Sequence, residues 1–179
     1  MSKPTSKITR TINSEQVLTA FVAVVRKNLP LNLKNTRITE DDIIYALAYA
    51  NVHRLSIESA CQELQGAPSG NRLREVLVDA LPDRIGMQRM LNRMFRQQLH
   101  PSIWKGKRDF NIAIDLTLIP YHGQPYEDKK EIVRSLPKSG TTHFHGYATV
   151  SIVRDDRRYV VALHFIEYGE EMADIVRWL

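Results

Sequence analysis

The chain has 179 residues, enough for one or two domains with a real hydrophobic core, and its 43% hydrophobic and 25% charged content is ordinary for a globular protein. Its single cysteine, Cys61, excludes an intrachain disulfide and a cysteine-rich zinc site, and it is consistent with a reducing compartment. No signal peptide and no apolar run long enough to span a bilayer is visible, so we expect a cytoplasmic protein with no membrane partner.

The net charge of +5 is unevenly distributed along the chain. Residues 1–110 contain 17 Lys and Arg against 10 Asp and Glu, whereas residues 111–179 contain 8 against 10. A basic front half indicates a polyanionic partner, most simply nucleic acid. An Arg-rich solvated surface would produce the same excess of positive charge.

Two helices are expected after a polar arm of about 12 residues. Asn13 and Gln16 form a capping box that opens the first helix. Thr39 and Asp42 form a similar start signal for a helix over 40–52. Both segments carry apolar residues at helical spacing, which predicts that one face of each packs on a core.

Two short helices follow at 57–64 and 70–81, separated by a turn that contains Gly66 and Pro68. This order is the outline of a helix-turn-helix, in which the N-terminal side chains of the second helix reach base edges in the major groove. Asn and Arg suit adenine and guanine. Such hairpins are also common in plain helical packing, and acidic residues on the second helix count against DNA. The candidate DNA-binding residues are Ser69, Asn71, Arg72 and Arg74.

Asp83 is a suitable N-cap for a helix that runs to about residue 99. Its apolar stripe is rich in methionine, while Arg89, Arg93 and Arg96 share the opposite face at spacing i, i+4 and i+7. That face suits phosphates, which position a protein on DNA without reading its sequence. A solvated helix surface accounts for the same pattern equally well.

The run over 111–119 is aliphatic apart from Asp115 at its centre. Read as a strand it is apolar on both faces, which is typical of a sheet interior, and Pro120 closes it because proline cannot donate to a ladder. A carboxylate in such a place is costly to ionise unless something compensates its charge. Asp115 therefore has either a structural partner or a functional role that involves a metal or a substrate.

A long polar loop is expected over 121–140, with a helical turn near 127–135. Strands are predicted at 142–153 and 158–166, joined by a four-residue turn of hairpin length. A helix with an acidic first turn begins after Gly169 and reaches the end of the chain.

His143 and His145 share one strand face, where both rings could reach a metal, but no carboxylate follows at ligand spacing.

The order of these features resembles the start of the catalytic domain of DDE insertion-sequence transposases. The features are the apolar strand with Asp115, the loop with Tyr121, His122 and Gly123, the run KSGTTHFH over 138–145, and the hairpin. The resemblance covers the chain from about Phe110 to its end and, more loosely, the helices before it. It implies a ribonuclease-H-like fold in which Asp115 is the first catalytic carboxylate, a ligand of two divalent ions, normally Mg²⁺, that act on the double-stranded DNA of element ends.

The resemblance also implies that the chain is only the front portion of such a domain. The family's second Asp and final Glu lie beyond the helix in which this sequence stops, so Asp115 would stand alone and Mg²⁺ binding would be weak or absent. In the family's sheet the first strand lies between the second strand and a strand missing here. The run over 111–119 would then be an open apolar edge, which favours aggregation or a homo-oligomer.

We therefore expect an α+β protein with an all-α, helix-turn-helix-like domain over 1–100 and a linker over 101–109. A truncated ribonuclease-H-like α/β domain of three strands and the start of a helix follows over 110–179. The expected function is transposase-like DNA binding, with incomplete strand cleavage, in the nucleoid-associated cytoplasm. The alternative is a stand-alone helix-turn-helix DNA-binding regulator, and a weaker third hypothesis is a small metal enzyme that uses His143 and His145.

Overall fold

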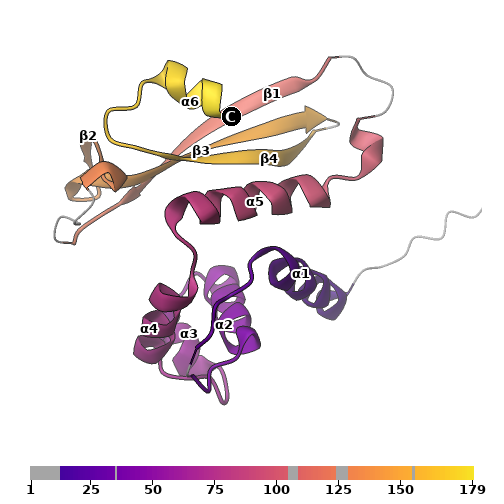
Figure 1. Ribbon diagram of the computed structural model, residues 1–179, viewed down its shortest axis with the longest axis vertical. Helices are drawn as coiled ribbons and strands as arrows, with labels where there is room; N and C mark the ends of the chain where they lie inside the picture. The colour runs from indigo at the N-terminus through magenta and orange to yellow at the C-terminus, as the bar shows by residue number, and fades with distance from the viewer. Residues whose placement is uncertain (1–12, 35, 105–108, 124–128, 155) are drawn as a thin grey trace, which may run out of the picture. The chain divides into compact units, whose positions relative to one another are not determined.

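The structure is a computed structural model that describes residues 13–34, 36–104, 109–123, 129–154 and 156–179. The chain forms two compact units, divided between Leu81 and Pro82 (Figure 1). The first unit is helical, and the second combines helices with a four-stranded antiparallel sheet. The expected α+β class is confirmed at this level.

The division between the units falls earlier than the linker expected over 101–109. Helix α5 (Arg84–Gln98) packs against strand β4 (Arg157–Ile166), so it belongs with the sheet. The residues just after α5 are also part of this unit, because η1 (Pro101–Ile103) buries Ile103 and receives hydrogen bonds from Arg154. The remaining basic residues of the expected linker, 105–108, lie outside the described residues.

The helical unit contains α1 (Ser14–Asn28), α2 (Glu40–His53), α3 (Ile57–Glu63) and α4 (Gly70–Ala80). The start signals form as expected: both capping boxes are complete, and the hydroxyls of Ser56 and Ser69 each accept a bond from the backbone N–H three residues on. The core lies among α2, α3 and α4 and comprises Ile38, Ile43, Ala46, Cys61, Leu73, Val76 and Leu77.

Cys61 is part of this core rather than a reactive thiol. Burial raises the pKa of the Cys61 thiol, and the nearby Glu58 carboxylate raises it further. Because the thiolate is the reactive form, both effects keep the side chain inert.

Gly70 opens α4 at the point where that helix comes nearest to α3. A Cβ at this position would lie 2.5 Å from the Cα of Glu58, a backbone atom that cannot move without disturbing the core. Gly70→Ala should therefore lower the free energy of unfolding by about 1–3 kcal/mol, although alanine is the better helix former. Chemical denaturation measures the difference.

The matched control for this prediction is Val78→Ala. Val78 lies on the same helix and is 79% exposed, so its truncation should change stability by no more than about 0.5 kcal/mol. If Gly70→Ala is as stable as this control, α3 and α4 can separate without a loss of stability. The close approach of Gly70 to Glu58 would then not require glycine at this position.

The sheet of the second unit is built around β3 (Thr141–Arg154). Strand β1 (Asn111–Pro120) pairs along one side of β3, while β2 (Val133–Lys138) and β4 pair with successive parts of its other side, and all pairs are antiparallel. The three strands expected from the sequence are thus confirmed to within a residue or so at each end.

Strand β2 was not expected. The sequence predicted loop and a helical turn near 127–135, but the described residues form a short η2 (Lys129–Glu131) followed by β2. Ser139 and Gly140 join β2 to β3 with φ angles of 53° and 77°, the two positive values of a tight type I′ hairpin turn. The expected loop is therefore wrong over 133–138, because a polar segment pairs with the part of β3 that β4 does not reach.

Helix α6 (Met172–Trp178) covers one face of the sheet (Figure 1). Ile175 packs there on Ala148 and Ile166. Beneath it, the buried ring of His164 lies 3.0 Å from both carboxylate oxygens of Glu170 and stacks on Trp178 at 5.7 Å. These contacts tie the connection after β4 and the end of α6 to the strand.

The outer edge of β4 is covered by polar side chains of α5. Asn92 both donates to the carbonyl of Leu163 (2.9 Å) and accepts from its N–H (2.6 Å), in the manner of a neighbouring strand. Gln88 accepts from the N–H of Phe165 (2.8 Å), and Arg84 donates to its carbonyl (2.8 Å). Covering an edge with a helix is one way in which proteins prevent unwanted strand pairing.

Candidate acidic strand and nucleic-acid interface

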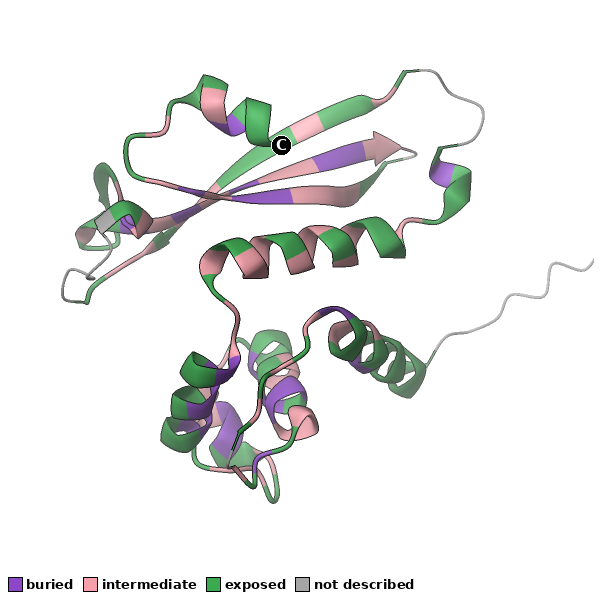
Figure 2. Cartoon of the chain, viewed as in Figure 1, coloured by how far each residue is buried: buried purple, intermediate pink, exposed green. Residues whose placement is uncertain are grey.

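Asp115 lies at the centre of β1, as expected, but its surroundings differ from the prediction. Strand β1 pairs with β3 alone among the described residues, and most of the strand is exposed (Figure 2). Asp115 is one of its exposed residues. The interior position inferred from its two apolar faces is therefore wrong, whereas the open edge implied by the resemblance agrees with the described residues. The carboxylate is solvated and does not need a buried partner.

The described residues around Asp115 supply no further carboxylate. Its direct cross-strand partner is Thr149, and the diagonal neighbours on the same face are Tyr147 and Ser151. None of these is a carboxylate, and nowhere in the described ranges do three or more His, Cys, Asp or Glu side chains gather as metal ligands. The described residues thus do not fit a two-ion Mg²⁺ site, and no catalytic step through Mg²⁺ follows from them.

The two histidines of β3 lie on the face that carries Asp115 but at a distance from it. His145 is opposite Ile119, four residues along the strand from Thr149, which corresponds to about 13 Å. Its ring contacts Tyr121 edge-on at 5.2 Å. The pair His143 and His145 gains no third ligand from the described residues, so the hypothesis of a small metal enzyme has no support here.

The predicted recognition residues of α4 are exposed, apart from their contacts with one another and with acidic neighbours. Ser69 caps the helix by accepting from the N–H of Arg72 at 3.3 Å. Arg72 pairs with Glu75 at 2.9 Å, and Arg74 bonds Asn71 at 2.7 Å. Because the Arg72–Glu75 ion pair and the Arg74–Asn71 hydrogen bond are solvent-exposed, each contributes little and can be exchanged for a phosphate or a base edge.

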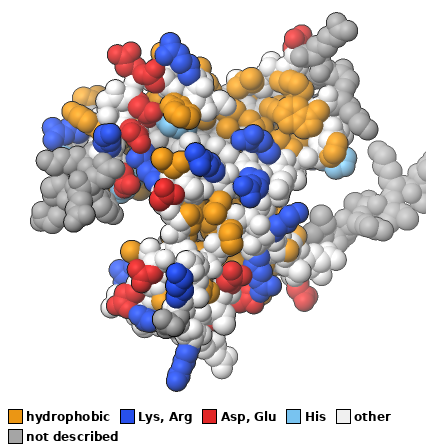
Figure 3. Space-filling view, viewed as in Figure 1, with side chains coloured by type: hydrophobic (Ala, Val, Ile, Leu, Met, Phe, Trp, Pro, Cys, Tyr) orange, Lys and Arg blue, Asp and Glu red, His pale blue; other side chains and the backbone are white. Residues whose placement is uncertain are grey.

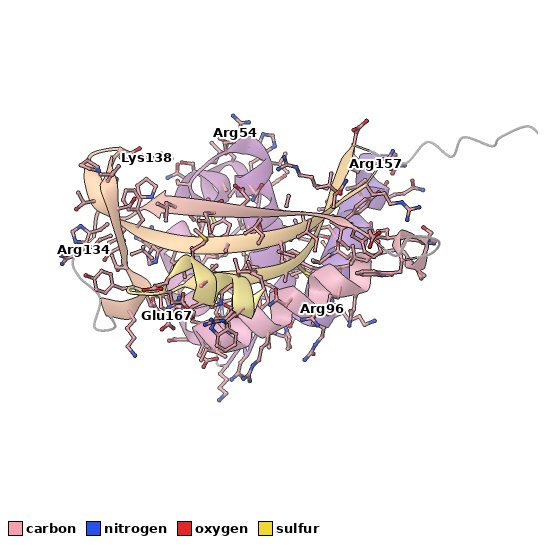
Figure 4. The ribbon with its side chains drawn as sticks, turned by 90° about the horizontal axis from the view of Figure 1, so that it is seen from above. Arg54, Arg96, Arg134, Lys138, Arg157 and Glu167 are labelled. Carbon is pink, nitrogen blue, oxygen red and sulfur yellow. The ribbon has the colours of Figure 1, made fainter. Side chains whose placement is uncertain are left out.

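The three arginines of α5 form a second exposed group, here called the arginine row: Arg89, Arg93 and Arg96. They line a surface hollow of about 380 Å³ together with Gln97, and the methionine-rich stripe of the helix is half-buried. In Figure 4, Arg96 projects from α5 on the side away from the strands. Three guanidinium groups facing one hollow suit a phosphate-rich ligand.

The structure also shows where the positive charge of the front half lies. Residues 13–81, the described range of the helical unit, contain seven Lys and Arg against eight Asp and Glu. Residues 82–110 contain seven against two. The helix-turn-helix-like hairpin therefore carries no basic excess. The excess of the front half belongs to residues 82–110, with four arginines on α5, and to residues 1–12, which contain three Lys and Arg and no Asp or Glu.

Sequence reasoning missed one group of residues in this region, Arg84, Gln88 and Asn92. Their regular spacing of four along α5 was visible, but the spacing alone does not reveal that a strand edge is the partner. In addition to its hydrogen bonds, Arg84 forms a 3.5 Å ion pair with Glu167.

Comparison of the chain with protein-family profiles, with characterised proteins and with solved structures found no match. Among the described residues, no helix is both long enough and apolar enough to cross a membrane.

Proposed function

We propose that this chain is a transposase-like DNA-binding protein with a ribonuclease-H-like sheet. The observation that carries the proposal is the order of the strands around Asp115. Asp115 lies at the middle of β1, which pairs with β3; β3 pairs in turn with β4, and α6 follows. This agrees with the order expected from the resemblance, in which a first strand with a carboxylate pairs with the second strand, and a hairpin and a helix follow.

DNA binding would rest on two surfaces with different tasks. The arginine row offers charge without sequence selectivity, since guanidinium groups there meet phosphates. The N-terminal end of α4 offers Asn71, Arg72 and Arg74, whose side chains suit base edges. Strand cleavage would be incomplete, because the described residues place no second carboxylate beside Asp115.

A test of this division of tasks compares Arg72→Ala with Arg93→Ala in the full chain. Arg72→Ala should cost about 1–3 kcal/mol on a preferred sequence and much less on random duplex, whereas Arg93→Ala should weaken binding to both alike. Fluorescence anisotropy with both duplexes measures the two losses. Equal effects of the two variants on the specificity ratio would contradict the assignment, and no salt-sensitive binding by the parent chain would contradict the proposed function.

A second candidate function is a stand-alone DNA-binding regulator. The observation in its favour is that the α3–α4 hairpin is folded on a core of its own unit, with Asn71, Arg72 and Arg74 exposed. Under this hypothesis, changes at Asp115 would leave every activity of the protein unaltered.

A further inference from the structure

The two long edges of the sheet differ in how they are protected. The β4 edge is sealed by Arg84, Gln88 and Asn92 of α5. The β1 edge has no neighbour among the described residues, and Figure 4 shows β1 as the outermost strand. Most of its residues are aliphatic, and its one charge and one proline are Asp115 and Pro120. Pro120 stands at the very end and Asp115 is a single charge, so the edge has few of the features by which proteins discourage pairing.

The hydrogen-bond pattern identifies the free backbone groups of β1. The N–H of Tyr121 bonds the carbonyl of His143, its direct partner in the continued register, at 2.8 Å. In an antiparallel pair such bonded residues alternate with residues whose N–H and C=O point outward. The odd-numbered residues of β1 therefore bond β3, and the outward groups belong to Ile112, Ile114, Leu116 and Leu118.

The side chains of these same residues form an apolar surface on one face of the sheet. Ile112, Ile114 and Leu116 are 65%, 43% and 41% exposed, and Leu118 is half-buried. Exposed hydrophobic side chains also gather into a patch on the sheet unit at the upper right of Figure 3. Free amides and apolar side chains thus coincide on one stretch of backbone, which is what strand addition requires.

We propose that β1 pairs with β1 of a second copy of this chain, antiparallel and about a two-fold axis at Ile114. A two-fold axis perpendicular to the sheet brings outward residues opposite outward residues, so the same surface serves both partners. The two sheets then become one, with the apolar faces of both copies continuous. The proposal needs neither DNA nor a metal, and it concerns the 179-residue chain. A further strand of the kind that the resemblance implies would take the same edge and exclude the second copy.

Charge and proline select the register among the symmetric alternatives. An axis at Asp115 would place the two Asp115 carboxylates directly opposite each other, which is unfavourable. An axis at Leu116 would place Pro120, which has no N–H and whose ring points outward, against Ile112 of the partner copy. An axis at Ile114 avoids both, because it sets Asp115 opposite Ala113 and leaves Pro120 outside the paired segment.

The register is tested by engineered cysteines in a Cys61→Ser background. Ile114→Cys should form an intermolecular disulfide on mild oxidation, because paired Cα atoms across the axis lie about 5.5 Å apart, within disulfide range. Leu116→Cys should not, because its two copies would be four residues out of register, about 13 Å apart. A stronger cross-link at position 116 than at 114 would overturn the register.

The interface itself is tested by sedimentation and by hydrogen exchange of the full chain. Ile114→Lys should weaken the dimer by about tenfold or more, since the axis places each new charge beside its copy, while Leu136→Lys, at an 84% exposed position on β2, should not. The amides of Ile112, Ile114 and Leu116 should be protected only in the dimer. A monomer at every concentration, or a monomer in which these amides are already protected, would overturn the proposal.

Discussion

A variant with Gln in place of Arg89, Arg93 and Arg96 should bind duplex DNA far more weakly than the parent chain, with an affinity that depends much less on salt. Each phosphate contact contributes about 0.9 to the slope of log affinity against log salt through counterion release. Loss of three contacts should therefore flatten the slope by about 2.7. Titrations at several salt concentrations measure it. The prediction follows from the charge of residues 82–110, seven Lys and Arg against two Asp and Glu.

The control for the arginine row removes the same charge from elsewhere in the same unit. Arg134, Arg157 and Arg158 are also exposed, and their replacement by Gln lowers the net charge equally. If this control loses as much affinity and salt dependence as the arginine-row variant, overall charge drives binding and the row has no special part in it. Unchanged unfolding curves for both variants would show that the fold is intact.

The second large effect concerns Asp115. The 179-residue chain should not cleave DNA in Mg²⁺, because Asp115 has no carboxylate neighbour among the described residues, and a two-ion mechanism needs both ions fixed. Under the proposed function, a longer chain whose added sequence supplies the second Asp and the Glu implied by the resemblance should acquire Mg²⁺-dependent cleavage of element-end DNA. Asp115→Asn in that longer chain should reduce cleavage to background while leaving DNA binding intact.

The cleavage assay has its own controls. Asp109→Asn removes an exposed carboxylate just before β1 and should leave cleavage unchanged. Metal-dependent cleavage by the 179-residue chain itself would show that other acids complete the site. If cleavage by the longer chain is unchanged by Asp115→Asn, this residue is excluded from the mechanism and the DNA-binding regulator is favoured.

The parts of the fold that the sequence predicted are those determined locally. The capping boxes at Asn13 and Thr39 start α1 and α2 where expected, because cap and partner lie within one turn of each other. Strands β1, β3 and β4 are equally evident from their aliphatic and aromatic residues. The turn at Ser139 and Gly140 was also a local signal, a dipeptide typical of tight turns, but β2 itself is too polar to be recognised as a strand.

The parts that could not be predicted depend on contacts between distant residues. The apolar faces of β1 indicated an interior strand, yet no local pattern distinguishes an interior strand from an apolar edge. The unit to which α5 belongs depends on bonds such as that of Asn92 with Leu163, 71 residues away. For the candidate site, residue types suited to base edges were evident at Arg72 and Arg74, but their contacts with Glu75 and Asn71 could not be predicted.

The side chains that join α5 to β4 match every fourth residue of the helix to every second residue of the strand. Four residues of a helix rise about 6 Å, and two residues of a strand about 6.6 Å. Asn92 meets Leu163 and Gln88 meets Phe165 at these intervals, and the longer Arg84 spans the accumulated mismatch to the carbonyls of Phe165 and Ile166. A gradual displacement of α5 along β4 would break these hydrogen bonds together. A displacement of a whole step, about 6 Å, would set donors opposite acceptors again and would carry the arginine row with it as a unit.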